Sequence, residues 1–225
     1  MSYREVNTMI REKAARFATC FGVATTFFTL MTASNRVEAV AYCSLRDPVS
    51  AIQEFFPNMT DYRSLLGSVE VNVRERLTSE LSYDMHFNEF GKHTLYLVYS
   101  GQAPIGLVQA RSEKGDWGLD EIAWALDVEM RIRDFRYQRS RSRGRDEIEQ
   151  QRFKNELIGK DFQALKTMLT EDGKRLVNPP EHLSQEARVL AATVIRSALK
   201  TILVTETVWG NTADVQLFLP KSGSS

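Results

Sequence analysis

The sequence predicts an α+β fold in which helices flank an antiparallel sheet, preceded by one N-terminal transmembrane helix. Two pairs of strand-like segments, each joined by a short turn, occupy the stretch from Thr94 to Gln138. Apolar residues recur at helical spacing on both sides of that stretch, which indicates flanking helices. A run without any charged residue, from Phe17 to Asn35, precedes all of these elements.

The uncharged run is long enough to cross a membrane. At about 1.5 Å of rise per residue, a helix over Phe17–Asn35 nearly spans the roughly 30 Å hydrocarbon core of a bilayer. Basic residues outweigh acidic ones before it, which places the N-terminus in the cytoplasm and everything after the run outside it. The predicted organisation is therefore a cytoplasmic N-terminus and signal anchor over residues 1–41, an extracytoplasmic domain over 42–220 and a disordered tail over 221–225.

Two other interpretations of this run remain open. The small residues of Ala39-Val40-Ala41 fit a signal-peptidase cleavage site, so the run is alternatively a signal peptide. The charges of Arg36 and Glu38 in front of that motif favour a retained anchor. A helix buried in a protein core is the third interpretation.

Two short helices are predicted between the uncharged run and the sheet. Pro48 suits the first turn of a helix, and Pro57 interrupts it. The apolar side of this helix would consist of Val49, Ile52, Phe55 and Phe56. The second helix is indicated by the i, i+4, i+8 spacing of Val73, Leu77 and Leu81.

The four predicted strands form two hairpins. Thr94–Ser100 and Ile105–Arg111 are rich in aliphatic and β-branched residues, and Gly101 between them tolerates the positive φ of a tight turn. Leu119–Leu126 and Ile132–Gln138 form the second pair across residues 127–130. By period-two alternation, the core faces of this second pair would carry Ile122, Trp124, Leu126, Phe135 and Tyr137.

Helices are predicted again after the sheet. One helix runs from about Asp146 to Ile158, and Gly159 supplies its C-terminal glycine. A second apolar side is formed by Phe162, Leu165, Met168 and Leu169. The longest helix begins at Ser184, a predicted N-cap, and continues beyond Ile202. Its hydroxyls at Thr193, Ser197 and Thr201 form a ladder that either bonds to carbonyl groups one turn earlier or serves a site.

Composition excludes several classes of function. The formal net charge is zero, which argues against a general nucleic-acid binder. The two cysteines, Cys20 and Cys43, and the three histidines, His86, His93 and His182, lack the spacing of a metal site. No local motif marks a nucleophile with its base.

Three segments carry a resemblance to a known family. They are residues 121–127 (EIAWALD), the helix end Phe153–Lys160 (FKNELIGK) and Phe55-Phe56-Pro57. Together with these segments, the order of the predicted elements from Thr94 to Trp209 resembles the FMN-binding domain family, which includes the periplasmic flavin subunits of sodium-pumping NADH:quinone reductases and related electron-transport complexes. The resemblance implies a single-pass protein of the inner membrane with its soluble domain in the periplasm, and subunits of a membrane redox complex as partners.

The resemblance also implies a cofactor site. Family members carry FMN through a phosphoester bond to the threonine of a Ser/Asp-Gly-Ala-Thr motif. Here Ala192, Thr193 and Ser197 agree with that pattern, but Ala191 stands in place of the glycine. Glycine lets the backbone approach a phosphate more closely than alanine does. A second family motif, Glu-Thr-Pro-Gly, is replaced by residues 140–144 (SRSRG). We therefore expect the fold to persist without covalent flavin.

Seven arginines lie within fifteen residues, a density found nowhere else in the chain. They are Arg131, Arg133, Arg136, Arg139, Arg141, Arg143 and Arg145. Guanidinium groups suit bidentate pairing with phosphates or carboxylates, so the last four are predicted to bind an FMN phosphate, an anionic lipid surface or an acidic partner. The alternative is a solvated face balanced by Glu113, Asp120, Glu121, Asp127 and Glu129.

Two functions from different classes follow. The favoured one is a membrane-anchored periplasmic subunit of a membrane redox complex, with a structural or assembly role and no covalent flavin. The alternative is an electron-transfer protein that carries covalent FMN, in which case the flavin itself performs the redox chemistry. An enzyme with its own small substrate comes third.

Overall fold

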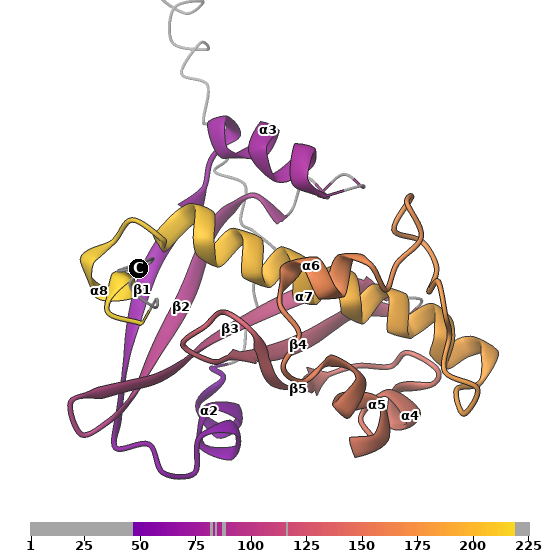
Figure 1. Ribbon diagram of the computed structural model, residues 1–225, viewed down its shortest axis with the longest axis horizontal. Coiled ribbons are helices and arrows are strands. Elements are labelled where there is room, and N and C mark those ends of the chain that lie inside the picture. Colours follow the sequence, from indigo (N-terminus) through magenta and orange to yellow (C-terminus); the bar gives the residue numbers. More distant parts are fainter. Residues whose placement is uncertain (1–46, 82, 84, 87–88, 116, 219–225) are drawn as a thin grey trace, which may run out of the picture. The chain divides into compact units, whose positions relative to one another are not determined.

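A single antiparallel sheet forms the centre of the domain. The structure, a computed structural model, describes residues 47–81, 83, 85–86, 89–115 and 117–218 (Figure 1). Five strands follow one another in the order β1-β2-β3-β4-β5, so each strand pairs with its neighbour in the sequence. Their bounds are β1 Asp61–Val69, β2 Gly91–Ser100, β3 Ala103–Gly115, β4 Gly118–Leu126 and β5 Ile132–Arg139. The predicted α+β class with an antiparallel sheet is confirmed.

The four predicted strands are present, and both hairpins are paired as expected. Gly101 adopts the positive φ of 59° that the first turn requires. Pro104 lies beside an irregularity in the pairing of β2 with β3, at Val98 and Tyr99, where its missing N–H is tolerated. The fifth strand, β1, is an addition to the prediction. Its burial alternates poorly and it lies at the edge of the sheet, so periodicity could not reveal it.

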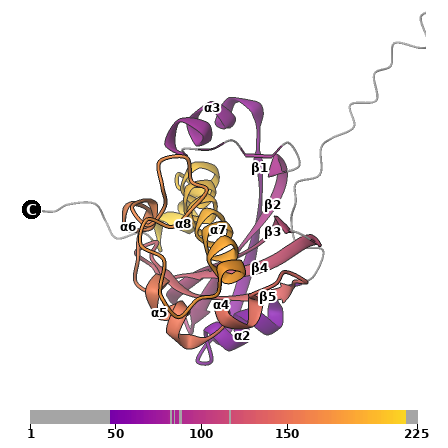
Figure 2. The ribbon, with the colours of Figure 1, turned by 90° about the vertical axis from the view of Figure 1, so that its right-hand side faces the viewer.

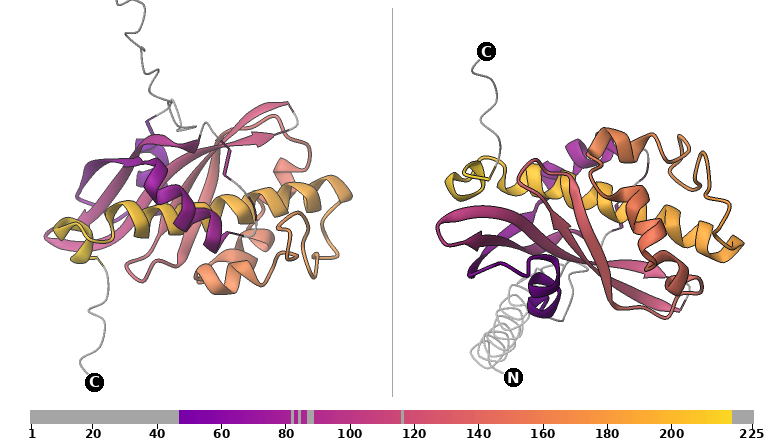
Figure 3. Two further views of the ribbon diagram at one scale, coloured as in Figure 1. Left: turned by 90° about the horizontal axis from the view of Figure 1, so that it is seen from above. Right: turned by 60° about the horizontal axis from the view of Figure 1, so that its bottom comes forward.

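Seven helices of the described residues surround the sheet. Their bounds are α2 Val49–Phe55, α3 Val71–Glu80, α4 Arg145–Ile148, α5 Gln151–Leu157, α6 Phe162–Lys166, α7 Gln185–Trp209 and α8 Ala213–Gln216. Helix α7 lies across one face of the sheet, and α2 covers the other (Figures 1 and 3). Two apolar layers therefore sandwich the sheet.

The two layers differ in size. On the α7 side, the ring centroids of Trp124 and Phe135 lie 5.0 Å apart, in the same core as the small residues Ala191, Ala192 and Ala198 of the helix. On the α2 side, the buried residues are Ala51, Ile52, Phe55, Phe56, Val98, Val108, Ala123 and Ala125. Gly106 lets Phe56 come close, because a Cβ there would lie 2.4 Å from the phenyl ring. Small side chains on β3 and β4 thus make room for the aromatic end of α2.

The prediction of one continuous helix from Asp146 to Ile158 is wrong. The segment consists of α4 and α5, separated by the extended backbone of Gln150. Ile148 and Phe153 are both fully buried but lie five positions apart. In one straight helix, residues five apart point to different sides, so a continuous helix could not bury both against the same core. The break resolves this conflict, and Gly159 follows with the expected positive φ.

Helix α7 begins where its sequence predicts, with Ser184 as the N-cap. The Ser184 hydroxyl accepts a hydrogen bond from Ala187 N–H and donates one to Glu147, which also accepts from the Ser184 N–H. The helix is the longest of the described residues. No helix among them combines the length and the apolar character needed to cross a membrane. The predicted anchor at Phe17–Asn35, its cleavage alternative and the tail 221–225 lie outside the described residues.

Candidate functional site

The predicted cofactor residues lie in the middle of α7. Thr193 comes about two turns after the start of the helix, so the free amides of that start are remote from it. Its side chain is half-buried, and its hydroxyl accepts a hydrogen bond from the Arg196 guanidinium at 2.9 Å. Thr193 is therefore a helix-interior residue that already has a cationic neighbour.

The other two predicted cofactor residues face the sheet. Ala192 is fully buried, as is its neighbour Ala191. Ser197 is fully buried too, and its hydroxyl accepts a hydrogen bond from the indole N–H of Trp124 at 3.0 Å. Thr193 is thus half-buried and lies one helical turn before Ser197, the residue whose hydroxyl connects α7 to β4.

The hydroxyl ladder of α7 divides into two parts. Thr201 and Thr205 donate to carbonyl oxygens one turn earlier, those of Ser197 and Thr201, at 2.8 Å each. This is the backbone-bonding interpretation, and it holds for the C-terminal half. In the N-terminal half the hydroxyls of Ser197 and Thr193 accept from side chains instead.

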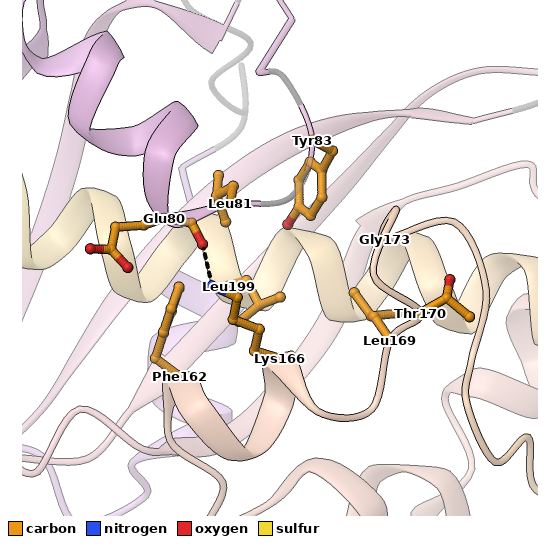
Figure 4. Close-up of a pocket in the computed structure, with 9 residues that line it drawn as sticks. All are labelled: Glu80, Leu81, Tyr83, Phe162, Lys166, Leu169, Thr170, Gly173 and Leu199. Carbon is orange, nitrogen blue, oxygen red and sulfur yellow. Dashed lines mark hydrogen bonds between the residues drawn. The ribbon is translucent and has the colours of Figure 1, made fainter.

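A small hollow lies on the outer side of α7, next to Arg196. Figure 4 shows the residues that line it, which come from the end of α3 and the residues after it, from α6 and the loop that follows it, and from α7. Lys166 donates to the carbonyl oxygen of Glu80 at 2.7 Å, and Tyr83 donates to that of Arg196 at 3.1 Å. The hollow holds about 10 Å³, the space of about one water molecule. It is a packing defect rather than a ligand site.

A wider groove of about 340 Å³ runs between α3, α6 and α7. Carboxylates dominate its lining, with Glu80, Glu129, Asp161 and Glu206 facing a single cation, Arg76. Burial raises the pKa of Glu206. Within the described residues, however, no group of three or more His, Cys, Asp or Glu side chains is placed to hold a metal ion.

The densest chemistry of the core is a cluster that sequence reasoning missed. Four charged side chains, each buried, meet between β3 and α7; we call them the buried ion cluster, Glu89, Arg111, Glu113 and Lys200. Lys200 Nζ lies 2.7 Å from Glu89 and 2.8 Å from Glu113. Arg111 donates to Glu89 at 3.1 Å. Two cations and two carboxylates therefore neutralise one another away from solvent.

Electrostatics within the cluster favours the ionised form of Glu89. Burial opposes the charge of Glu89, but the nearby positive charges of Lys200 and Arg111 outweigh it and hold the Glu89 pKa below its ordinary value. Glu89 also accepts the His86 backbone N–H at 2.9 Å. A buried pair of this kind gains little over apolar packing, but removing one partner leaves an uncompensated charge.

His93 borders the cluster as a neutral residue. Burial and the charge of Arg111 lower the His93 pKa to about 4. Its Nε2 lies 2.8 Å from the Glu89 carbonyl oxygen, which requires Nε2 to carry the proton. In the described part of the chain, His93 Nδ1 and Glu113 Oε1 lack a hydrogen-bond partner. The hydrogen-bonding capacity of the cluster is thus incompletely satisfied at these two atoms.

The sequence did contain a signal for this cluster. Arg111 and Glu113 alternate with the strand period on the same side of β3 as Leu107, so both side chains point at α7. Lys200 is the only charged residue between Arg196 and Glu206 of a helix that is otherwise apolar there. Opposite charges on two core-facing surfaces indicate a buried pair, but only once the two surfaces are known to touch.

The arginines of the sequence prediction are distributed over several structures. Arg131 pairs with Glu129, Arg136 with Glu54, and the Arg133 guanidinium stacks on Phe56. The remaining four belong to what we call the arginine loop, residues 139–145 at the end of β5 and the start of α4, namely Arg139, Arg141, Arg143 and Arg145. The first three arginines thus fix α2 and a turn, and only the arginine loop presents a cationic surface.

The arginine loop is anchored without the help of its own arginines. The Ser142 hydroxyl donates to Asp120 at 2.6 Å. Gly144 has a φ of 79°, and a Cβ there would lie 2.6 Å from the Cα of Ala187. The loop is therefore pressed against β4 on one side and the start of α7 on the other; Figure 2 views the molecule from this side.

The four side chains differ in their partners. Arg145 pairs with Glu149 at 2.7 Å, and Arg139 lies 3.9 Å from Glu121. Arg143 lies over the exposed ring of Trp117, with 5.9 Å from guanidinium carbon to ring centroid. Arg141 is exposed and has no partner in the described part of the chain. Of the predicted balancing acids, Glu129 and Glu121 do pair with arginines, whereas Glu113 belongs to the buried ion cluster.

A scan against models of protein families gives no match for this chain, and no curated protein matches it. The resemblance to the FMN-binding domain family therefore stays a prediction that rests on the motifs themselves.

Proposed function

We propose that this chain is a membrane-anchored periplasmic subunit of a membrane redox complex, with an FMN-binding-like fold and a structural or assembly role. It carries no covalent flavin. One observation carries the proposal most directly: Thr193 lies in the interior of a regular helix and its hydroxyl is already engaged by Arg196.

The surroundings of Thr193 support this proposal. Phosphate groups are bound best where free backbone amides converge at the start of a helix. That place in α7 is taken by Ser184 and Glu147, whose carboxylate occupies the Ser184 N–H. The neighbouring Ala191 and Ala192 are fully buried, so a phosphate group could not approach the backbone at these two residues.

A structural role is supported by how the buried polar groups are used. The buried ion cluster and the Ser197–Trp124 hydrogen bond both connect α7 to the sheet. Groups that are paired inside a core are held in place rather than presented to a substrate. The hollow beside Arg196 has no room for a substrate either.

One observation favours the alternative, a covalent FMN carrier. The Arg196 guanidinium lies 2.9 Å from the Thr193 hydroxyl, so a phosphoester at that oxygen would find a counter-charge in place.

Flavin attachment is tested in a host that attaches FMN in the periplasm. The full chain is run on a denaturing gel under ultraviolet light, and its intact mass is measured. We expect a dark band and an unmodified mass. A fluorescent band that is lost in Thr193→Ala but kept in Thr201→Ala would establish the electron carrier instead. Thr201 is the matched control, because its hydroxyl is buried and bonded to a carbonyl.

A further inference from the structure

An exposed aromatic residue lies at the tip of the β3–β4 hairpin, next to the arginine loop. Trp117 is 62% exposed, and Leu119 beside it is 40% exposed. Arg143 lies over the Trp117 ring, and a Cβ at Gly115 would be 2.7 Å from the Ser142 hydroxyl, so hairpin tip and loop are in contact. We call this surface the tip patch; it comprises Lys114, Trp117, Leu119, Arg139, Arg141 and Arg143.

The cations of the tip patch are available to an external anion. Arg141 and Arg143 form no ion pair with a described carboxylate, and Lys114 is exposed. Among the described acids nearby, Asp120 accepts from Ser142, and the buried Glu121 lies 3.9 Å from Arg139, which leaves Lys114, Arg141 and Arg143 without an ion pair to a described carboxylate. A cationic surface with a protruding apolar centre results.

This combination suits the interface of a bilayer better than a protein carboxylate patch. Tryptophan prefers the headgroup level of a membrane, where its ring is partly apolar and its N–H can be hydrated. Lysine and arginine side chains near an anionic leaflet gain electrostatic attraction, and their apolar stems allow the charges to reach the headgroups. An acidic protein partner would use the arginines but would leave Trp117 and Leu119 unexplained.

The described chain begins next to the residue that precedes the arginine loop. The first described residue, Asp47, accepts a hydrogen bond from Gln138, the residue before Arg139. Helix α2 then continues along β5, where Arg136 pairs with Glu54. The described chain therefore begins at the same end of β5 as the arginine loop.

We infer that the tip patch docks onto a bilayer surface that contains anionic phospholipid, with Trp117 at the headgroup level and the arginines on the lipid phosphates. The inference rests on the membrane anchoring of the proposed function but not on the absence of flavin. Docking would fix the orientation of the domain above the membrane. A subunit that supports a neighbouring membrane protein requires such a fixed orientation.

Trp117 is its own reporter. The chain has three tryptophans, and Trp124 and Trp209 are 0% and 2% exposed. The full chain is reconstituted into vesicles of phosphatidylcholine with or without phosphatidylglycerol, each with bromine on the acyl chains close to the headgroups. We expect bromine quenching of Trp117, and protection from aqueous acrylamide, only where phosphatidylglycerol is present. Trp117→Phe supplies the background of the two buried rings.

The charge requirement is tested by Arg139→Gln, Arg141→Gln and Arg143→Gln combined. At about fivefold per arginine, the ratio of docked to undocked domain should fall roughly 100-fold. The matched control removes three exposed cations elsewhere, by Arg152→Gln, Lys174→Gln and Arg175→Gln, and should dock like the parent. High salt applied to the unmodified chain gives the same test without a substitution, because it screens exposed charges.

The outcomes separate the inference from the proposal on which it rests. Flotation with vesicles of phosphatidylcholine alone reports the N-terminal anchor, and its failure would contradict the anchoring. Floating chains whose Trp117 stays open to acrylamide with phosphatidylglycerol present would overturn the docking. So would equal quenching in the triple-glutamine chain. Trp117 that is protected only by an added acidic protein would assign the patch to a protein partner and overturn the inference as well.

Discussion

The buried ion cluster and the arginine loop are built from the same kinds of side chain, but their surroundings are opposite. In the cluster, Lys200 and Arg111 are 7% and 1% exposed in their side chains and are held by two carboxylates. In the loop, Arg139 is 50% exposed and Arg141 has no partner in the described part of the chain. One group of charges connects a helix to a sheet, and the other faces outward.

The difference shows that burial, rather than charge density along the sequence, decides what a charged residue does. A buried pair that loses one partner leaves a charge in a poorly polarisable medium, at a cost of about 3–5 kcal/mol. An exposed pair contributes about 0–1 kcal/mol, because water solvates its members when they separate. The conspicuous arginines should therefore matter least for folding and the scattered cluster most.

The largest effect should come from Lys200→Met, which keeps the length of the side chain but removes its charge. Glu89 and Glu113 would then share one cation, Arg111, in the core. We expect the free energy of unfolding to fall by about 3–5 kcal/mol in chemical denaturation followed by circular dichroism.

A second substitution separates charge from packing. Removing an acid as well, in Lys200→Met with Glu113→Gln, should recover part of the loss, so the two changes are not additive. Lys174→Met is the matched control: its side chain is 74% exposed, and it should cost less than about 0.5 kcal/mol. Equal losses at Lys200 and Lys174 would show that the cluster does not stabilise the fold.

His93 should give the cluster a pH dependence. Its pKa of about 4 in the folded chain lies below the ordinary value of 6.5, so between these values the unfolded chain binds more protons. Stability from His93 is therefore present above pH 6.5 and is lost as pH falls towards 4. The loss should approach about 3 kcal/mol, at 1.36 kcal/mol for each unit of pKa difference.

The measurement compares the parent with His93→Gln, whose amide can still donate to the Glu89 carbonyl. The difference in unfolding free energy between the two chains should change between pH 7 and pH 4. His86→Gln, at an exposed position, is the control for the loss of an imidazole. Parallel pH curves for the parent and His93→Gln would refute the assignment.

Sequence signals that extend over only a few residues correctly predicted strands with alternating apolar residues, a helix N-cap and turns that need glycine. The alternation of Ile122, Trp124 and Leu126 predicted a core-facing strand, and all three are buried. The N-cap at Ser184 and the positive φ at Gly101 and Gly159 were also predicted correctly, since each is fixed by bonds within a few residues.

The remainder depended on contacts between distant segments. The edge strand β1 is held mainly by its pairing with β2, which its own sequence does not encode. The break at Gln150 follows from burying both Ile148 and Phe153. In the candidate site, Thr193 was found by motif, but its engagement by Arg196 and the burial of Ser197 required the course of the whole helix.

The smallest effect is expected in the arginine loop, where the partners of the side chains differ. Arg141→Gln with Arg143→Gln removes two guanidinium groups that make no ion pair with a described carboxylate; only the stacking of Arg143 on Trp117 is lost. The free energy of unfolding should change by less than about 0.5 kcal/mol. Arg139→Gln with Arg145→Gln removes the same charge but also the contacts with Glu121 and Glu149.

This second pair should cost about 1 kcal/mol, because Glu121 is buried and Glu149 also accepts the backbone N–H of Tyr137. Both double variants are compared with the parent at low and at high salt, and the difference between them should shrink as salt screens the exposed pairs. A loss of several kcal/mol in Arg141→Gln with Arg143→Gln would make these two arginines structural. The arginine loop would then stabilise the fold as the buried ion cluster does, and the predicted difference between the two regions would be refuted.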